Sequence, residues 1–400
     1  MKLLNILLML GLSAGSLLAQ VAVKGKTIYT MNGPAIQDGI ILMRDGKIEK
    51  VGKASEISIP SGYVVHEAVV VTPGLIDAHS VVGLAGYLNQ DHDQDQLDKS
   101  SPIQPELRAI DAYNARENLV TWLREHGVTT VHTGHGPGAL ISGQTLIAKT
   151  HGGTVDQAVI QPQAMLAMTL ADSARDEKSP GTRAKMMAML RAQFLKASEY
   201  MEKLEKAEED KTPKRDLKME VLVQALKGEL PVMITANHAV DIANALRLAK
   251  EFNLKLVLDS GAEAYFLKDQ LKEAGVPVFI HATMLRTFGE QQNASMETAA
   301  ILRDAGIQVA FQSGFESYVP KTRVVLFEAS IAAANGLGFD RALEAITIQP
   351  AKILGIDHRV GSLQPGKDGD LALFDGDPFE YLTHVTGVFI NGEQVSEKKR

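Results

Sequence analysis

The sequence of 400 residues is long enough for one large domain with a smaller one, or for two to three average domains, and its 45% hydrophobic and 22% charged residues are typical of globular proteins. A formal net charge of −7, with no basic patch interrupted by aromatic residues, argues against a nucleic-acid partner. The absence of cysteine excludes a disulfide, a thiol nucleophile, a cysteine-ligated zinc and a lipoprotein anchor.

The first 19 residues have the pattern of an export signal. Met1-Lys2 forms a short positive start, residues 3–10 are apolar, and small residues follow up to Ala19. The apolar core is too short to span a bilayer. We therefore predict a signal peptide over residues 1–19, cleaved after Ala19, and a periplasmic or secreted protein without a stable membrane span. An uncleaved membrane anchor is the alternative.

Both ends of the remaining chain are rich in β-forming residues. Two such runs flank Asp45-Gly46, which predicts a hairpin because glycine readily adopts positive φ. The tail after Gly361 has the same short strands and tight turns. Neither end alone is large enough to bury a sheet. We therefore predict one small discontinuous β-sandwich domain, built from residues 20–68 and 362–400.

Between these ends, residues 69–361 repeat a helix followed by a buried strand. Helices are predicted to end at Gly127, Asn253, Gly275 and Gly306. Strands are predicted at 128–131, 254–258, 276–280 and 307–311, with further candidates at 144–149, 158–165 and 231–236. Such units indicate parallel strands packed by helices, and about eight of them would close a (β/α)8 TIM-like barrel of the α/β class. Residues 134–142 are too few for a crossover helix, so either the barrel is irregular there or one strand assignment is wrong.

Two insertions interrupt the repeat. Residues 89–105 are rich in aspartate, but they lack the EF-hand spacing, which favours a solvated loop over a calcium site. Residues 183–227 are strongly helical, and apolar side chains between Met187 and Leu204 form one stripe. That helix either covers the barrel or pairs with a second copy in a homo-oligomer.

Side chains that can carry chemistry gather where the predicted strands end, which is the functional face of a barrel. They are Asp77, His79, His132, His135, Asn237, His238, Asp259, Glu263, His281, Gln312, Ser313 and Glu316. Histidine suits divalent metals, and a hydrolytic zinc needs three protein ligands with one open position. Each histidine taken alone also fits a hydrogen-bonded core residue.

The stretch VVVTPGLIDAHSVVG, from Val69 to Gly83, resembles the first-strand motif PGLIDxHxH of the amidohydrolase superfamily, in its imidazolonepropionase-like, exported branch. The tail from Gln349 to Leu371 is similar to the family motif NPAxxLGxxxxxGxLxxGKxADL. The resemblance implies a TIM-like barrel with a β-domain from both chain ends. It also implies hydrolysis of C–N bonds at a divalent metal centre.

Four of the five metal-ligand positions implied by the resemblance are substituted. His79 matches the first histidine of the motif, but Val81 replaces the second. The histidines of the fifth and sixth strands fall on Thr235 and Ser260, and the aspartate of the eighth strand falls on Gly314. Valine and glycine side chains offer no donor atom, so the usual binuclear centre is not expected.

Two further features have alternative interpretations. Lys149 is either the counterpart of the carboxylated lysine that some members of the family use, or a structural lysine. The glycine-rich stretch 134–143 could bind an anion through its amides, but it lacks a phosphate-loop Lys-Ser/Thr pair, which favours an active-site loop.

The leading hypothesis is an exported hydrolase that acts with water on the C–N bond of a small amide, cyclic amide or short peptide. One zinc-like divalent metal would be held by a rearranged set that includes His79 and His281. Asp259, Glu263 and Glu316 are the candidate acid–base residues. The substrate pocket is predicted to include His132, His135, Asn237, His238, Gln312 and Ser313. The rival hypothesis is a catalytically degenerate amidohydrolase-fold protein, lacking the metal centre, with a binding or accessory role.

Overall fold

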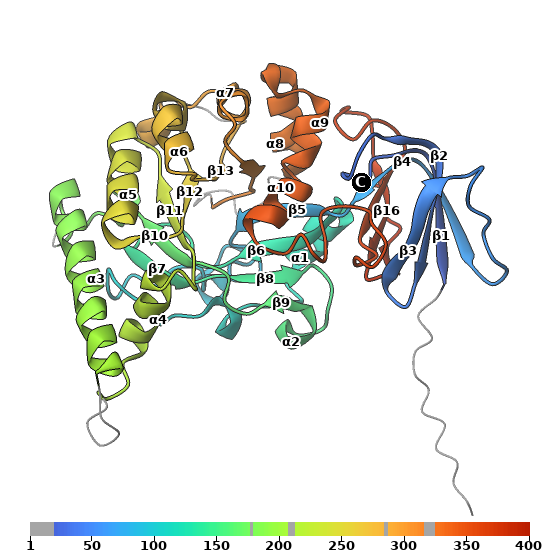
Figure 1. Ribbon diagram of the computed structural model, residues 1–400. Coiled ribbons are helices and arrows are strands. Elements are labelled where there is room, and N and C mark those ends of the chain that lie inside the picture. The colour runs from blue at the N-terminus through green and yellow to red at the C-terminus, as the bar shows by residue number, and fades with distance from the viewer. Residues whose placement is uncertain (1–19, 177–178, 207–212, 284–286, 316–324) are drawn as a thin grey trace, which may run out of the picture.

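The computed structural model describes residues 20–400 except 177–178, 207–212, 284–286 and 316–324 (Figure 1). The predicted signal peptide and Glu316 lie outside these described residues. The described part is a mixed α/β structure with sheets of seven, six and four strands. Within it, no helix combines the length and apolar character needed to cross a membrane.

The seven-stranded sheet combines the two ends of the chain. Its members are β1 (Val21–Ile28), β2 (Ile36–Arg44), β3 (Lys47–Lys53), β4 (Val64–Pro73), β15 (Leu371–Phe374), β16 (Val385–Ile390) and β17 (Glu393–Ser396). The order is β17-β16-β15-β4-β1-β2-β3, in which β4 runs parallel to β1 and antiparallel to β15. The sheet encloses apolar side chains from both ends, including Ile41, Val71 and Phe389.

The hairpin predicted at Asp45-Gly46 is confirmed. Strands β2 and β3 pair antiparallel on either side of these two residues. Asp45 has a φ of 52° and Gly46 a φ of 80°, so both adopt the left-handed conformation that a two-residue hairpin turn requires.

The other two sheets form the body of the molecule. The six-stranded sheet contains β7 (Ile141–Gln144), β10 (Leu166–Thr169), β11 (Val232–Ala236), β12 (Leu256–Ser260), β13 (Val278–Ile280) and β14 (Val309–Phe311), in the order β14-β13-β12-β11-β10-β7. The four-stranded sheet contains β5 (Leu75–Ser80), β6 (Val128–Thr133), β8 (Leu146–Lys149) and β9 (Val159–Gln161), in the order β5-β6-β8-β9. A bridge between Ser80 and Gly314 connects the end of β5 with the segment after β14.

The expectation of parallel strands throughout is wrong for one segment. Strands β7 and β8 follow each other across Thr145, and they pair antiparallel with β10 and β6, respectively. The segment that leaves β6 is too short for a crossover helix, so the chain folds straight back along β6, as antiparallel neighbours allow. The strand expected at 158–165 is confirmed in part, because β9 lies within it, and a separate strand, β10, begins directly after it.

Helices pack around the sheets of the body (Figure 1). They are α1 (Asn118–Glu125), α2 (Val155–Ala158), α3 (Arg183–Glu205), α4 (Leu217–Leu226), α5 (Ala239–Phe252), α6 (Lys268–Glu273), α7 (Thr298–Asp304), α8 (Val325–Ala332), α9 (Phe339–Glu344) and α10 (Ile348–Ile353). Helix α5 ends at Asn253, whose φ of 52° gives a left-handed C-cap at a predicted stop.

The predicted apolar stripe of α3 packs against α4 and α5, at the end of the molecule far from the seven-stranded sheet (Figure 1). Leu190 and Phe194 are fully buried there, whereas Leu204 at the end of the stripe is exposed. The stripe therefore covers the body of its own chain.

Lys149 is a structural lysine that joins the body to the seven-stranded sheet. Its ammonium pairs with Asp370 and lies 3.1 Å from a carboxylate oxygen of Asp368. The three side chains are 4%, 3% and 2% exposed, so this ion cluster is shielded from water. Lys47 and Arg359 also pair with Asp368. The Lys149 ammonium is thus occupied by ion pairs, which argues against the carboxylated-lysine interpretation.

Candidate functional site

The carboxyl ends of the parallel strands bring several predicted residues together. Asp77 and His79 lie in β5, Asp259 lies in β12, and His281 and Gln312 directly follow β13 and β14. Parallel strands present their carboxyl ends at one edge of a sheet, so residues far apart in the sequence meet there. His79 and Asp259 are 1% and 2% exposed, which places their contact inside the protein.

His79 and Asp259 form the central ion pair. Nδ1 of His79 lies 2.9 Å from Oδ1 of Asp259, and Nε2 of His79 is buried without a hydrogen-bond partner among the described residues. Thr235 Oγ1 and Gln312 Nε2 each donate a hydrogen bond of 2.6 Å to the same carboxylate. Three donors thus fix Asp259, and Asp259 in turn fixes the imidazole.

The protonation of this pair follows from its surroundings. Burial alone would lower the pKa of His79, but the charge and hydrogen bond of Asp259 outweigh burial and raise it above the usual range. Burial would raise the pKa of Asp259, yet the charge of His79 and the donated hydrogen bonds hold it below its usual range. The two shifts agree in direction, since each partner favours the charged form of the other, an imidazolium beside a carboxylate.

Asp77, two residues before His79 in β5, has a different side-chain partner. Its carboxylate accepts hydrogen bonds from Ser313, 3.0 Å from the backbone nitrogen and 2.5 Å from the hydroxyl. Burial raises the pKa of Asp77 to about 7, although Ser313 and the charge of His79 oppose that rise. Ser313 therefore anchors Asp77, and it is not among the residues that line the neighbouring cavity.

Replacing Asp77 with asparagine is expected to remove a pH dependence of stability. In the folded protein the pKa of Asp77 is about 7, above the ordinary value of 3.8. Between pH 3.8 and pH 7 the Asp77 carboxyl therefore keeps a proton in the folded protein that it has lost in the unfolded protein. The free energy of unfolding of the wild type should therefore fall as pH rises through this window, by up to about 1.4 kcal/mol per unit. Denaturant unfolding of both proteins at about pH 4, 5.5 and 7 tests this. A stability difference that stays constant across the window would contradict it.

His132 and His135 do not enter the cavity. Nδ1 of His132 donates to the carbonyl of Ala78 at 2.6 Å, and Nε2 lies 2.6 Å from the hydroxyl of Thr145. Burial lowers the pKa of His132 to about 3 and that of His135 to about 4. His132 is therefore a neutral, hydrogen-bonded core residue, and neither histidine is among those that line the cavity.

A cavity of about 390 Å³ lies against the ion pair. Its lining includes His79, Thr235, Asn237, Asp259, Ser260, His281 and Gln312 from the strand ends, and Ala171, Ser173, Phe288, Glu290 and Gln291 from two neighbouring loops. Burial raises the pKa of Glu290 above its usual range. The volume is that of a small-molecule site.

Ser260 is held in an unusual backbone conformation at this cavity. Its φ of 71° lies in the left-handed region, which a serine adopts only at a cost in conformational energy. Ser260 directly follows Asp259 at the end of β12, so the strained residue adjoins the ion pair.

Glu263 and His238 lie beside the cavity and bind each other. The carboxylate of Glu263 is 3.2 Å from Nδ1 of His238, and it accepts hydrogen bonds from the backbone nitrogen of Ala239 at 2.6 Å and from Asn293 at 2.7 Å. Both oxygens of Glu263 are therefore engaged, and neither Glu263 nor His238 is among the cavity-lining residues. Of the predicted acid–base residues, Asp259 alone lines the cavity, and Glu316 lies outside the described residues.

Sequence reasoning missed Asp172 and Glu290. Their carboxylates and the imidazole of His238 place ligand atoms within 4.8 Å of one another. Across the described ranges of the chain, this is the one group of three or more potential ligands that meets that distance. Asp172 and Glu290 lie in short 3-10 helices, at Asp172–Ala174 and Gly289–Gln291, with no motif around them that could have signalled a site.

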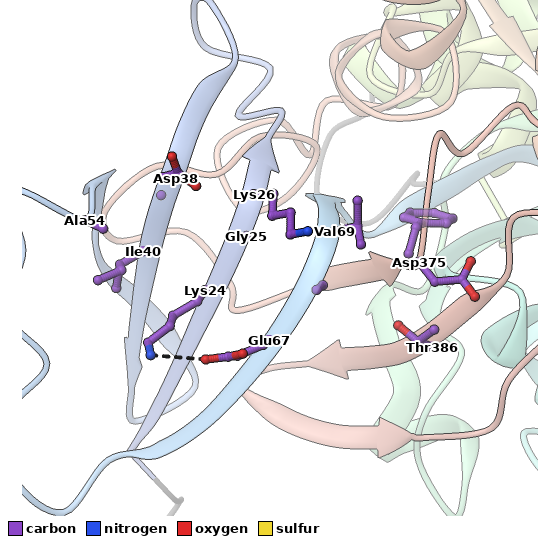
Figure 2. Close-up of a pocket in the computed structure, with 13 residues that line it drawn as sticks. Lys24, Gly25, Lys26, Asp38, Ile40, Ala54, Glu67, Val69, Asp375 and Thr386 are labelled. Carbon is purple, nitrogen blue, oxygen red and sulfur yellow. Dashed lines mark hydrogen bonds and ion pairs between the residues drawn. The ribbon is translucent and has the colours of Figure 1, made fainter.

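A larger hollow of about 610 Å³ lies on the seven-stranded sheet, away from the strand ends that carry Asp77 and His79. Figure 2 shows Lys24 and Glu67 paired across β1 and β4 beside it, at 3.1 Å. Both side chains of that pair are exposed. We assign no chemistry to this hollow, because it lacks the buried, mutually oriented charges of the strand ends.

The metal centre that the family resemblance implies does not fit these residues. Thr235 uses its hydroxyl to bind Asp259, and Asp259 holds Nδ1 of His79. At Gly314, an added Cβ would lie 2.7 Å from Nε2 of His281, so no aspartate can stand there unless His281 moves. The inherited positions thus converge on a hydrogen-bonded histidine–carboxylate pair, in which Asp259 favours the protonated form of His79.

Comparisons with known proteins agree with this architecture. The model of the amidohydrolase family matches residues 70–395. Amidohydrolase tasK from Hapsidospora irregularis is 24% identical over 391 residues, which cover 88% of this chain and 39% of tasK, so the chain spans well under half of that relative. Imidazolonepropionase from Porphyromonas gingivalis W83 is 24% identical over 401 aligned residues, covering 90% of this chain and 88% of the relative.

Among solved structures, the crystal structure of an amidohydrolase from Thermotoga maritima MSB8 has a TM-score of 0.89 and 30% sequence identity. The match covers 94% of this chain and 100% of that protein, and such neighbours imply a TIM barrel with an additional domain. From the family match and these relatives, the chain belongs to the amidohydrolase family, in its imidazolonepropionase-like branch.

Proposed function

We propose that this protein is a hydrolase that uses water to cleave the C–N bond of a small amide, cyclic amide or short peptide. The observation that carries the proposal is the buried His79–Asp259 pair against the cavity at the strand ends. Membership of a family whose relatives are named amidohydrolase and imidazolonepropionase supports the same class of reaction.

His79 supplies the electrophilic group in this proposal. Asp259 holds Nδ1, so the second proton of the imidazolium resides on Nε2, which has no partner in the part of the chain that the structure describes. An N–H donor fixed in a water-poor site stabilises the negative charge that develops on an amide oxygen under attack. The same proton can then pass to the leaving nitrogen as the C–N bond breaks, because imidazolium is an effective general acid near neutral pH, and the neutral imidazole that remains takes up the proton that the added water loses.

Asp259 is a positioning residue in this scheme. Its carboxylate already accepts hydrogen bonds from Thr235 and Gln312 in addition to its contact with His79. A carboxylate so fully occupied is poorly placed to take a proton from water. Its role is to orient the ring and keep it charged, as the third member of a hydrolytic triad does.

The test is turnover of a panel of cyclic amides, N-acyl amino acids and dipeptides by purified protein, with the released amine or acid measured by mass spectrometry. We expect at least one substrate to be hydrolysed. His79→Gln should lower kcat by about 10²- to 10⁴-fold, whereas the exposed His358→Gln, the matched control, should leave kcat unchanged. Equal losses in both variants would refute the role of His79.

The second candidate is a binding protein without catalysis. The observation that favours it is the loss of donor atoms at Val81 and Gly314, which removes the centre implied by the family. Binding of a panel compound at the cavity, abolished by His79→Gln but without turnover over hours, would support this candidate over the hydrolase.

We also propose that the body is a closed eight-strand barrel and that the chain ends form a β-sandwich. In this scheme β7 and β8 together form one bent strand of the barrel. The bridge between Ser80 and Gly314 closes the barrel between β5 and β14. The domains would be 20–68 with 362–400, and 69–361. A 69–361 fragment that unfolded cooperatively at full stability would contradict this division.

Export of the protein to the periplasm or medium, with cleavage after Ala19, is a separate proposal. The apolar run that begins the chain motivates it. N-terminal sequencing of protein from its native host decides it, and a mature chain that starts at Met1 would refute it.

A further inference from the structure

A second cluster of potential ligands lies at the edge of the cavity, away from the positions of the family's metal. Asp172 opens the loop after β10, His238 precedes α5 at the end of β11, and Glu290 lies in the loop after β13. Three elements distant in the sequence thus converge, and their ligand atoms lie within 4.8 Å of one another. Glu290 itself lines the cavity, as do Ala171 and Ser173 beside Asp172 and Asn237 beside His238.

His238 is oriented as a metal-binding histidine is. Nδ1 of its ring faces the carboxylate of Glu263 at 3.2 Å, which leaves Nε2 for an ion. Glu263 is itself fixed by the backbone nitrogen of Ala239 and by Asn293. A carboxylate behind the distal nitrogen is the usual support of a ligating histidine, because it sets the tautomer and the direction of the ring. Glu263 is not one of the three ligands, so this support is independent of their clustering.

The charges around the cluster leave room for a cation. Asp172 pairs with Arg175 at 3.1 Å, and Asp241 pairs with Arg183 at 2.7 Å. Glu290 and Glu263 have no lysine or arginine at ion-pair distance among the residues with described positions. Of the two carboxylate ligands, Asp172 is thus partly neutralised by Arg175, whereas Glu290 lacks a lysine or arginine partner among the described residues and keeps a charge that a cation can balance.

We propose that Asp172, His238 and Glu290 bind one divalent transition-metal ion, of the Mn²⁺ or Zn²⁺ class, at the edge of the cavity. Two carboxylate ligands and one imidazole suit such ions better than Ca²⁺, which takes six to eight oxygen ligands. Three protein ligands leave a coordination position open on an ion that borders the cavity. The site does not rest on the proposed hydrolysis, because binding of the ion can be measured without any substrate.

The test is titration of untagged, EDTA-treated full-length protein with Mn²⁺ and Zn²⁺ by calorimetry, with Mn²⁺ binding also followed by electron paramagnetic resonance. We expect about one ion per chain. Asp172→Asn, His238→Asn and Glu290→Gln should each weaken binding by at least about tenfold, the range typical of disturbed metal shells. Circular dichroism and unfolding without metal should confirm that the variants are folded. Glu290→Gln keeps a side-chain oxygen that can still accept the hydrogen bond from the backbone nitrogen of Asp172.

Three control variants change residues outside the cluster. Asp269→Asn and His358→Ala replace exposed side chains and should bind the ion as the wild type does. His79→Ala should also retain the ion, because His79 is not part of the cluster. Absence of binding by the wild type at about millimolar metal would overturn the proposal. So would binding that survives in all three cluster variants, or binding lost in His79→Ala and kept in Glu290→Gln.

Discussion

Replacing Lys149 with methionine is expected to lower the free energy of unfolding by about 3–5 kcal/mol, the usual effect of removing one partner from a buried ion pair. Methionine fills a similar volume, but it leaves the carboxylates of Asp368 and Asp370 buried with less compensating charge. Asp368 still has Lys47 and Arg359, whereas the Asp370 carboxylate keeps, among the described residues, the hydrogen bond that it accepts from the backbone nitrogen of Asn391, at 2.9 Å. Denaturant unfolding followed by circular dichroism measures the loss.

The matched control is Lys352→Met, which removes an exposed lysine and should change stability by less than about 0.5 kcal/mol. Adding Asp370→Asn to Lys149→Met removes one of the orphaned charges and should recover part of the lost stability. A loss below about 1 kcal/mol in Lys149→Met would show that water reaches this cluster and that the two parts of the molecule are not joined there.

Asp259→Asn is expected to remove the positive charge from His79 at pH 7. In the wild type, the carboxylate outweighs the burial that would otherwise lower the pKa of His79. Without the carboxylate, burial dominates, so the pKa should fall below the ordinary value and the ring should be neutral. We expect kcat on any substrate found to fall by about 10²- to 10⁴-fold, as for loss of general acid catalysis.

Nuclear magnetic resonance of histidine ring nitrogens measures this change directly, with His79→Gln used to assign the signal. The exposed Asp269→Asn is the matched control and should leave both the signal and the activity as in the wild type. A variant that keeps an imidazolium at pH 7, or keeps full activity, would mean that the ion pair does not control the site.

The elements of the body could be predicted because their signals are local. Apolar runs after glycine or asparagine stops identified most strands, and Asn253 is a left-handed C-cap as expected. The direction of β7 and β8 could not be read from the sequence, because side-chain alternation is the same in parallel and antiparallel strands. The short connection after β6 was the signal that the strand order is irregular there, because it leaves no room for a crossover helix.

The candidate site was predictable only where a motif carried it. Asp77, His79 and Asp259 were placed at strand ends from their local sequence, and the structure brings His79 and Asp259 into contact across 180 residues. The hydrogen bond from Gln312 to Asp259, and the meeting of Asp172 with Glu290, arise only when remote loops converge. The ion pair of Lys149 could not be predicted from local sequence either, because its partner Asp370 lies 221 residues further along the chain.

The seven-stranded sheet has a consequence for how the protein is made. Strand β4 lies between β1 and β15, so one of its edges has no partner until the ribosome has added roughly 300 more residues. An unpaired edge with apolar residues such as Val70 and Val71 is a template for pairing with other chains. The first strands must therefore avoid pairing with other chains through most of translation, until β15 has been made and covers the open edge of β4.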